Sequence, residues 1–308
     1  MMGAPAMGSG TQPQQVSVSV VLPVRDGREV IGTQIASLAQ QTTDLAWELV
    51  VADNGSTDGT ANEVRRWESS LPSLVVVDAS RRSGINVARN AGVAAARGRL
   101  ILHCDDDDAV AADWVDRMAT ALSSADVVGG AVELRSLNGH LRFASDLPAE
   151  PRIPTQHHAL PWAIGCNLGY SREVFDAIGG FDEGLPERGG GDLDFSWRAQ
   201  QAGFRFQHVP DAVVARRLRP TLASALKQHY RYGRASVVLD ARFTPRVTGP
   251  VEPTTRASFA REMVLRSRQV VQGPLPRRQY LQQVAYHLGR QVAKRSRRAT
   301  EPGQPVPR

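Results

Sequence analysis

The stretch Trp47–Thr60, WELVVADNGSTDGT, is an apolar run that ends in a polar turn. The run Trp47–Asp53 has the hydrophobicity of a buried strand, and the turn Asn54–Gly59 should open a helix. That helix would carry Val64 and Trp67 on one face. A buried strand followed directly by an amphipathic helix is typical of a parallel sheet, so this stretch predicts an α/β fold.

The same alternation recurs on both sides of this stretch. Three more apolar, β-branched runs predict strands, and two amphipathic or alanine-rich segments between them predict helices. The sequence therefore predicts a mostly parallel, Rossmann-like sheet with helices on both faces. The further strands are Val16–Val24, Leu74–Asp78 and Arg99–Cys104, and the further helices are Arg28–Gln40 and Ile85–Arg97.

From Asp126 onward the pattern is less regular. Asp126–Leu134 predicts one further strand, and Ser171–Ala177 and Asp192–Ala202 predict helices that end at glycines. Beyond Pro220 the chain is expected to be helical and basic. We expect residues 1–15 to form a disordered leader and the last ten residues to be disordered as well.

The composition is that of a globular protein: of 308 residues, 42% are hydrophobic and 22% are charged. This excludes a disordered or collagen-like chain, and no apolar run is long enough to span a membrane. The first residues lack the pattern of a secretory signal, and Cys104 and Cys166 are the two cysteines, so we expect a cytoplasmic protein.

The charge is divided unevenly along the chain. Residues 215–308 hold 20 Arg or Lys side chains and four acidic ones, a net charge of +16, whereas residues 1–214 carry a net charge of −10. A basic tail on an acidic body predicts that the tail meets an anionic partner. We expect the tail to bind the anionic inner face of a membrane, and no nucleic acid, because the tail lacks interleaved aromatic residues. The alternative is a solvated helical hairpin or a contact between copies of the chain.

Acidic residues follow three of the predicted strands: Asp26, Asp53 and the run Asp105–Asp108. Ligands of parallel α/β sheets bind beyond the carboxyl ends of the strands, so these carboxylates should meet in one crevice. Adjacent carboxylates repel one another unless a cation neutralises them, and Mg²⁺ and Mn²⁺ prefer such oxygen ligands. The alternative is a solvated acidic loop that caps the helix around Trp114.

Two other patterns allow more than one interpretation. The turn after Asp53 can be a simple connection in which Ser56 or Asp58 caps the next helix, while the Asp53 carboxylate accepts hydrogen bonds from a nucleobase or a ribose. The cysteines with His103 are a weak zinc pattern, and small buried core thiols are the more common case.

Several motifs in this order and spacing resemble the family-2 glycosyltransferases, which have the GT-A fold. The resemblance covers about residues 16–235 and rests on motifs in both halves of that span. In the first half they are Val20–Asp26, Val50–Thr60, Gly84–Gly98 and Asp105–Asp108. In the second half they are Trp162–Arg172, Gly179–Glu183 and Gly189–Arg198.

The resemblance implies an inverting enzyme that transfers a sugar from a nucleotide-diphospho-sugar to a hydroxyl acceptor with help from Mn²⁺ or Mg²⁺. It implies that Asp105 and Asp107 bind the metal, Asp107 directly, and that Asp192 is the catalytic base. The implied donor-binding residues are Pro23, Val24 and Asp26 at the base pocket, Asp53 on the base, Arg81, Gly84 and Arg89 near the ribose and diphosphate, and Asp105 and Asp106.

The resemblance also implies a division of the chain. Residues 16–125 would bind the nucleotide-sugar, residues 126–215 the acceptor, and residues 216–308 would form a basic helical extension. A non-catalytic nucleotide-sugar-binding protein of the same fold is the alternative function.

Two positions depart from the family pattern. Gly191 stands where many relatives have Glu, and the segment at Ala215 lacks a histidine that many relatives place there. Either Arg216 or Arg217 would contact phosphate in place of that histidine, or the site would bind metal weakly or work without it.

Overall fold

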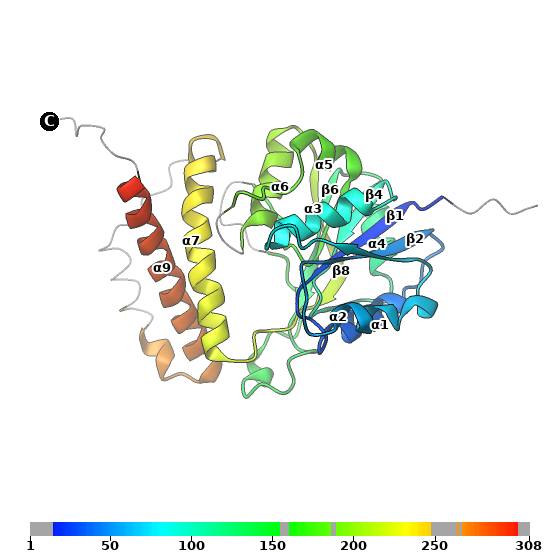
Figure 1. Cartoon of the computed structure of the whole chain (residues 1–308). Helices are drawn as coiled ribbons and strands as arrows, with labels where there is room; N and C mark the ends of the chain where they lie inside the picture. The colour runs from blue at the N-terminus through cyan, green and yellow to red at the C-terminus, as the bar shows by residue number, and fades with distance from the viewer. Residues whose placement is uncertain (1–14, 155–159, 186–188, 248–263, 265–266, 301–308) are drawn as a thin grey trace, which may run out of the picture.

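The computed structural model describes residues 15–154, 160–185, 189–247, 264 and 267–300 (Figure 1). Within these residues the chain forms an eight-stranded sheet in the order β3-β2-β1-β4-β7-β6-β8-β5. The strands are β1 Val18–Val24, β2 Trp47–Asp53, β3 Leu74–Asp78, β4 Leu100–His103, β5 Ala109–Val110, β6 Val127–Glu133, β7 Leu168–Ser171 and β8 Phe206–Ala215.

Helices cover both faces of the sheet, which confirms the predicted fold class. The α-helices are α1 Ile31–Ala39, α2 Thr60–Arg65, α3 Ile85–Ala95, α4 Trp114–Ala121, α5 Arg172–Ile178, α6 Gly191–Gln201, α7 Leu222–Val247 and α9 Pro274–Thr300. Short 3-10 turns occupy Glu68–Ser70, Ala144–Asp146 and Ser267–Val270.

Strands β1 to β4 are parallel to one another, as the alternating sequence predicts. In β1, Val20 pairs with Leu49 of β2 on one side and with Leu102 of β4 on the other. Because successive side chains point to opposite faces, Val20 packs with α1 and α4, whereas Val21 packs with α3, α5 and α6. The carboxyl ends of these strands therefore lie at one edge, where the predicted acidic residues follow them.

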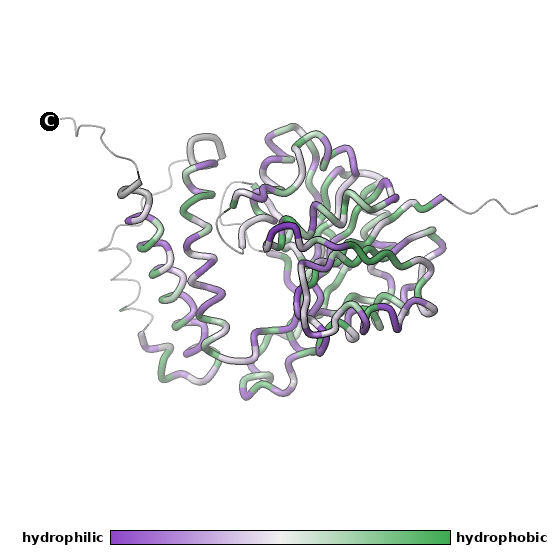
Figure 2. The backbone as a smooth tube through the Cα atoms, viewed as in Figure 1, coloured by the Kyte–Doolittle hydropathy of each residue, from purple (hydrophilic) through white to green (hydrophobic). Residues whose placement is uncertain are grey.

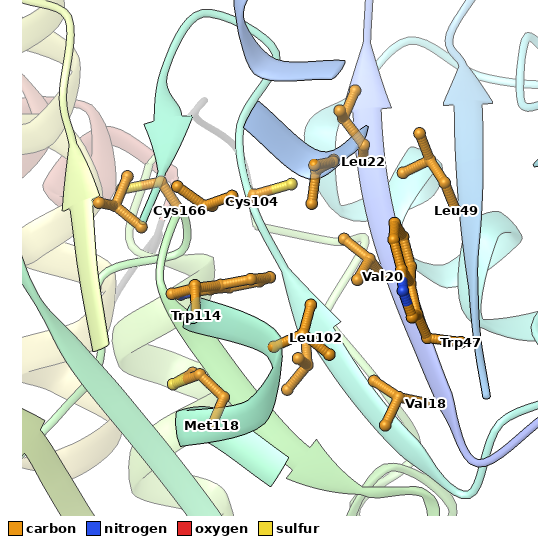
Figure 3. Close-up of a cluster of buried hydrophobic side chains, with 14 of the residues drawn as sticks. Val18, Val20, Leu22, Trp47, Leu49, Leu102, Cys104, Trp114, Met118 and Cys166 are labelled. Atoms are coloured by element: carbon orange, nitrogen blue, oxygen red, sulfur yellow. The ribbon is translucent and has the colours of Figure 1, made fainter. Parts of the chain in front are cut away.

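The core on the α1 and α4 side extends into the second half of the sheet (Figure 3). Trp114 is fully buried, and its indole N–H donates to Asn167 Oδ1 at 2.9 Å. The Asn167 side-chain amide in turn donates to the carbonyls of Ala131 and Ala212, each at 2.8 Å. One buried asparagine thus joins α4 to β6 and to the middle of β8.

The second half of the sheet is only partly predicted by the sequence. Strand β6 was expected over Asp126–Leu134, but β7 and β8 were not expected as strands. Strand β7 has four residues and runs antiparallel to both β4 and β6, and β8 carries polar residues among its apolar ones. Neither has the long apolar run that marks the parallel strands.

Helices α7 and α9 lie side by side beside the α/β body (Figure 1). Their backbones touch at two glycines: a Cβ at Gly233 would lie 1.8 Å from the carbonyl oxygen of Tyr286. Likewise, a Cβ at Gly289 would lie 2.0 Å from the carbonyl oxygen of Tyr230. Hydrophobic residues concentrate along the central strands, whereas α7 and α9 mix hydrophilic and hydrophobic positions (Figure 2).

The expected helical character of the C-terminal segment is confirmed. Helix α9 reaches Thr300, so the expected disorder of the last ten residues is wrong for Ala299 and Thr300. Continued i to i−4 hydrogen bonding extends the helix past the basic run. Residues 301–308 and 1–14 lie outside the described residues. Within the described parts, no helix combines the length and apolar character needed to cross a bilayer.

Candidate active site

Asp26 and Asp53 brace the turn that follows β2. Asp26 has a left-handed backbone, with φ of 53°, and its Oδ1 accepts a hydrogen bond from the Thr57 amide at 2.8 Å. Asp53 Oδ1 accepts from the Ser56 amide at 2.8 Å, so this carboxylate closes its own turn. The left-handed backbone of Asp26 is strained for a non-glycine residue, and such strain is often found at functional sites.

The N-cap of the helix after this turn is Gly59, not Ser56 or Asp58, and no side chain caps it; Asp58 instead bonds to the first helical residue. Asp58 Oδ1 accepts from the Thr60 amide at 2.9 Å and from the Thr60 hydroxyl. Hydrogen bonding from the Thr60 side chain is the main cause that lowers the pKa of Asp58. Its Oδ2 accepts from the Arg28 amide at 3.0 Å, which ties the loop after β1 to the start of α2.

The other predicted donor-binding residues lie at the same edge of the sheet. Pro23 and Val24 are buried at the end of β1, opposite Ala52 and Asp53. The Gly84 amide donates to Asn54 Oδ1 at 2.8 Å. Arg81 has a side chain that is 72% exposed and pairs with Glu183 at 2.9 Å, so it reaches toward the second half of the chain.

The four aspartates follow β4 and are poorly solvated. Burial is the main cause that raises the pKa of Asp106 to about 7 and the pKa of Asp108 to about 8, and neighbouring aspartates add to the effect. Burial and the charge of Asp105 also raise the pKa of Asp107. A solvated acidic loop would not perturb these groups in this way, so the sequence alternative of a solvated cap is disfavoured.

Arginines surround these carboxylates. Arg89 is 4% exposed and pairs with Asp105 at 3.4 Å, which brings two predicted site residues together. Arg217 donates its backbone N–H to Asp108 Oδ1 at 2.8 Å and its Nε to the Asp107 carbonyl at 2.9 Å. Arg219 pairs with Asp107 at 3.1 Å.

Arg219 was not predicted from the sequence, although it belongs to the same basic run as Arg216 and Arg217. The positive charge of Arg216 favours the ionised forms of Asp107 and Asp108. The segment that lacks the family histidine therefore supplies several positive charges to the acidic run.

The carboxylates fit a hard divalent cation. Ligand atoms of Asp105, Asp108 and Cys166 lie within 4.8 Å of one another. No N–H or O–H group of the described chain donates to Asp108 Oδ2, an oxygen that is buried beside this group. Such an oxygen is available to a metal ion, and Mn²⁺ and Mg²⁺ bind carboxylates well. Asp107, the predicted direct ligand, is not in this group and pairs with Arg219 instead.

The weak zinc pattern receives no support from the geometry. Cys104 and Cys166 are free and buried, and burial raises the pKa of both thiols, which disfavours the thiolate that zinc binds. His103 is buried, and its Nε2 lies 2.6 Å from the Tyr170 hydroxyl. The cysteines thus act as small core residues.

Asp192 lies within the first turn of α6 rather than at its N-cap, which is Gly190. Its Oδ2 accepts a hydrogen bond from the Gly165 amide at 3.0 Å. A Cβ at Gly165 would lie 2.3 Å from Nη2 of Arg89, so only glycine fits between the two side chains. Arg89, which pairs with Asp105, and Asp192 are therefore neighbours across Gly165.

Steric crowding explains why position 191 is a glycine. A Cβ there would lie 2.4 Å from Oδ1 of Asn86, a buried side chain whose Nδ2 donates to the Asp182 carbonyl at 2.8 Å. The glutamate that many relatives carry at this position would collide with Asn86. Asp194, two residues after Asp192, is fully buried and pairs with Arg198 at 2.7 Å and with Arg242.

Helix α7 packs directly on the loop that precedes Asp192. A Cβ at Gly189 would lie 2.6 Å from the Tyr232 ring, and one at Gly190 would lie 2.8 Å from Leu239. Burial raises the pKa of Tyr232, which also lies within the electrostatic influence of Asp192 and Asp105. Nothing in the sequence pattern marked Tyr232, because its neighbours at the site are distant in the chain.

Two protein-family models match the sequence of this chain. The model of glycosyl transferase family 2 matches residues 19–179. A second model, glycosyl transferase family group 2, matches residues 100–265. The two matches overlap across the acidic run after β4 and together cover both halves of the sheet.

Curated relatives carry transferase names. Glycosyltransferase AglE of Haloferax volcanii is 27% identical over 226 residues, which cover 71% of this chain and 73% of that protein. Validoxylamine A glucosyltransferase of Streptomyces hygroscopicus subsp. jinggangensis is 28% identical, over 60% of this chain and 52% of that protein.

A solved structure has the same fold. The mannosyltransferase PcManGT from Pyrobaculum calidifontis, solved with GDP-Man and Mn²⁺, superposes with a TM-score of 0.57 at 21% identity. The match covers 94% of this chain and 79% of that one. At this identity the similarity establishes the fold, and the fold is the one that the sequence motifs implied.

Proposed function

This chain belongs to glycosyl transferase family 2 and is a glycosyltransferase, and from that premise we propose that it transfers a sugar from a nucleotide-diphospho-sugar to a hydroxyl acceptor with inversion. The complex of PcManGT with GDP-Man supports a nucleotide-sugar as donor. The acceptor would be a glycan, a lipid-linked glycan or a small molecule, in a pathway of polysaccharide or cell-wall biosynthesis.

The observation that carries this proposal is the contact of Arg89, Gly165 and Asp192. Asp192, in the proposed acceptor half, is thereby near the arginine that pairs with Asp105. Asp192 would accept the proton of the acceptor hydroxyl as that oxygen bonds to the anomeric carbon. The glycines before Asp192 make room for α7 rather than for the acceptor, because Gly189 and Gly190 lie against Tyr232 and Leu239.

On the donor side we propose that Pro23, Val24 and Asp26 line the base pocket and that Asp53 binds the base. Asp53 uses Oδ1 to close its turn, and the hydrogen bond of the Ser56 amide orients the carboxylate. The proposed ribose and diphosphate contacts are Arg81, Gly84 and Arg89, with Asp105 and Asp106 beside them.

We propose that Asp105 and Asp107 hold Mn²⁺ or Mg²⁺, with Asp108 within reach of the same ion. When bound, the cation would offset the negative charge that develops on the departing nucleoside diphosphate. Asp105 is oriented by Arg89, and Asp107 by Arg219. Arg217 fixes the backbone of the acidic run through the Asp107 carbonyl.

Thermal denaturation with nucleotides tests the donor and metal assignments. UDP and GDP, each with and without Mn²⁺, should raise the melting temperature if they bind the folded chain. At a ligand concentration 100 times the dissociation constant, binding adds about 2.7 kcal/mol to the free energy of unfolding. Asp107→Asn should lose the Mn²⁺-dependent part of this shift, whereas Asp113→Asn, an exposed acid paired with Arg117, should retain it. A full Mn²⁺-dependent shift in Asp107→Asn would refute the metal assignment.

We also propose that α9 meets an anionic membrane surface. Leu288 and Val292, one turn apart on α9, are 54% and 37% exposed, and the basic residues Arg277, Lys294 and Arg295 of the same helix are exposed. Each basic side chain near such a surface contributes about 1 kcal/mol. Sedimentation with vesicles containing anionic lipid should show binding that falls with salt, and binding that ignores salt would contradict the proposal.

A further inference from the structure

The segment Arg216–Arg219 follows β8 and lies against the acidic run. Arg219 Nη1 donates to Asp107 Oδ2 at 3.1 Å, and Arg217 contacts the backbone of Asp107 and the carboxylate of Asp108. Together with Arg89 on Asp105, these arginines place positive charges among the four aspartates. Much of the negative charge that would attract a divalent cation is therefore already compensated by the chain itself.

The arginine segment is held in place from behind. The fully buried Asn138 donates its Nδ2 to the Arg216 carbonyl at 2.7 Å and accepts from the Leu218 amide at 2.8 Å. Arg278 of α9 is 8% exposed and donates to the Arg219 carbonyl at 2.6 Å. The backbone of the segment is thus fixed by two buried side chains, one of them from the C-terminal helix.

The backbone of Arg219 is fixed by buried side chains, but its own side chain is much more exposed. It is 46% exposed, whereas the Arg89 side chain is 5% exposed and also packs over the Phe181 ring. A half-exposed guanidinium on a flexible stem can exchange one anionic partner for another at little cost. Asp107, which it holds, is 16% exposed and so has few other partners for its charge.

We propose that Arg219 is a built-in counter-cation that holds Asp107 until a nucleoside diphosphate binds, which makes divalent-cation binding depend on the nucleotide. This inference rests on the proposed donor and metal site. A divalent cation that arrives alone meets the guanidinium at Asp107 and is repelled by it. A diphosphate offers Arg219 a second anionic partner and adds negative charge near the cation, so the two ligands bind better together.

The coupling must be reciprocal: the nucleotide strengthens cation binding by the same factor as the cation strengthens nucleotide binding. Arg219→Gln removes the counter-cation, so Mn²⁺ alone should bind this variant at least about fivefold more tightly than wild type. UDP without metal should bind the variant more weakly, since it loses one cationic partner. The ratio of Mn²⁺ dissociation constants without and with saturating UDP should therefore fall.

The experiment measures free Mn²⁺ by its electron paramagnetic resonance signal, with protein alone and with protein plus UDP or GDP. Arg219→Lys keeps the charge and should keep the weak binding of Mn²⁺ alone. Arg205→Gln removes an arginine paired with Asp126 at 3.6 Å, at the start of β8 and far along the chain from the acidic run, and should behave as wild type. The two variants separate a local charge effect from a change in folding or in net charge.

Equal affinity of Arg219→Gln and wild type for Mn²⁺ alone would overturn the inference while leaving the proposed function intact. Tighter Mn²⁺ binding in Arg205→Gln as well would reduce the effect to net charge and overturn it too. Failure of the proposed function has a different signature, because neither UDP nor GDP would then bind wild type with or without Mn²⁺. Tighter binding of Mn²⁺ in Arg219→Gln but not in Arg219→Lys supports the counter-cation.

Discussion

Carboxylates lie at opposite ends of the parallel strands, Glu48 at one end and the acidic run at the other, and their pKa values shift in opposite directions. Glu48, the second residue of β2, has a fully buried side chain. It accepts hydrogen bonds from the Ser19 hydroxyl at 2.6 Å and from the backbone amide and Nε of Arg97, both at 2.7 Å. Burial would raise the pKa of Glu48, but these donors together lower it.

Asp106, which is half-buried, and Asp108, which is buried, lie at the carboxyl end of β4 and receive fewer donors, and their pKa values rise to about 7 and about 8. Burial raises the pKa at both ends of the sheet, so the supply of hydrogen-bond donors and the repulsion between neighbouring aspartates distinguish the two ends. A carboxylate whose partners are complete stabilises the fold, as Glu48 does. A cluster that is costly to ionise in the folded chain is retained for another reason, and function is the reason proposed here.

The largest expected effect is at the proposed active site, in Asp192→Asn. Asparagine keeps an oxygen that can accept from the Gly165 amide, but it cannot take a proton from the acceptor hydroxyl. The transfer rate should fall by about a hundredfold to ten-thousandfold, while the melting temperature and the UDP or GDP affinity should change little. The rate, the melting temperature and the affinity are measured on the same variant.

A transfer rate near that of wild type would assign Asp192 a purely structural role. Asp194 would not replace it as the base, because Asp194 is fully buried and held by Arg198 and Arg242.

At the amino end of β2, Glu48→Gln should lower the free energy of unfolding by about 2 kcal/mol. Hydrogen bonds to a charged acceptor are lost, and one donor of Arg97 loses its acceptor. The Arg97 side chain is 58% exposed, which limits its share of this loss. Urea denaturation measures the change, and Glu63→Gln, on a side chain paired with the exposed Arg66, is the matched control. Nucleotide affinity should be unchanged. A loss of affinity without a loss of stability would reverse the proposed difference between the two ends.

The pH dependence of stability sharpens the same contrast. The folded-state pKa of Glu48 lies below its ordinary value of 4.5, so its contribution is complete above that value and is lost as the pH falls through the folded pKa. Wild type should therefore lose stability relative to Glu48→Gln in the acid range below about pH 4.5. Urea midpoints measured from pH 3 to pH 7 test this, and parallel curves for the two proteins would contradict it.

The sequence predicts most of the first half of the molecule because its signals are local. The parallel strands are apolar runs, Asp58 accepts a hydrogen bond from the amide two residues further on, and the acidic run lies at the end of a recognisable strand. The convergence of Asp26, Asp53 and Asp105 at one edge follows from parallel topology alone. Glu48 also had a local signal, since an acid inside an apolar strand must find donors.

The rest depends on contacts between residues far apart in the chain. Asp107 and Arg219 are separated by 112 positions, and no local pattern links them. The fit of Gly191 against Asn86 and of Gly189 against Tyr232 depends on backbone positions set by the whole fold. For that reason the sequence identified the residue types at the site but missed how Arg219 and α7 complete it.

The smallest expected effect is a gain of stability from Asp106→Asn in the metal-free chain. A Cβ at Gly27 would lie 2.5 Å from Asp106 Oδ2, so the site is tight and only an isosteric replacement fits. Burial, with the charges of Asp107 and Asp105, raises the folded-state pKa of Asp106 from 3.8 to about 7. The folded state therefore binds more protons than the unfolded state between these values.

It follows that ionisation of Asp106 lowers stability as the pH rises from about 4 to about 7, the opposite sign to Glu48. Asparagine removes this penalty, so Asp106→Asn should be more stable than wild type by on the order of 1 kcal/mol at pH 8 and equal to it near pH 4. Urea denaturation in a chelating buffer measures both points, and Asp44→Asn, at an exposed loop position, should show no such difference. A loss of stability at pH 8 would mean that Asp106, like Glu48, has enough donors, and the contrast between the two ends of the sheet would fail at this residue.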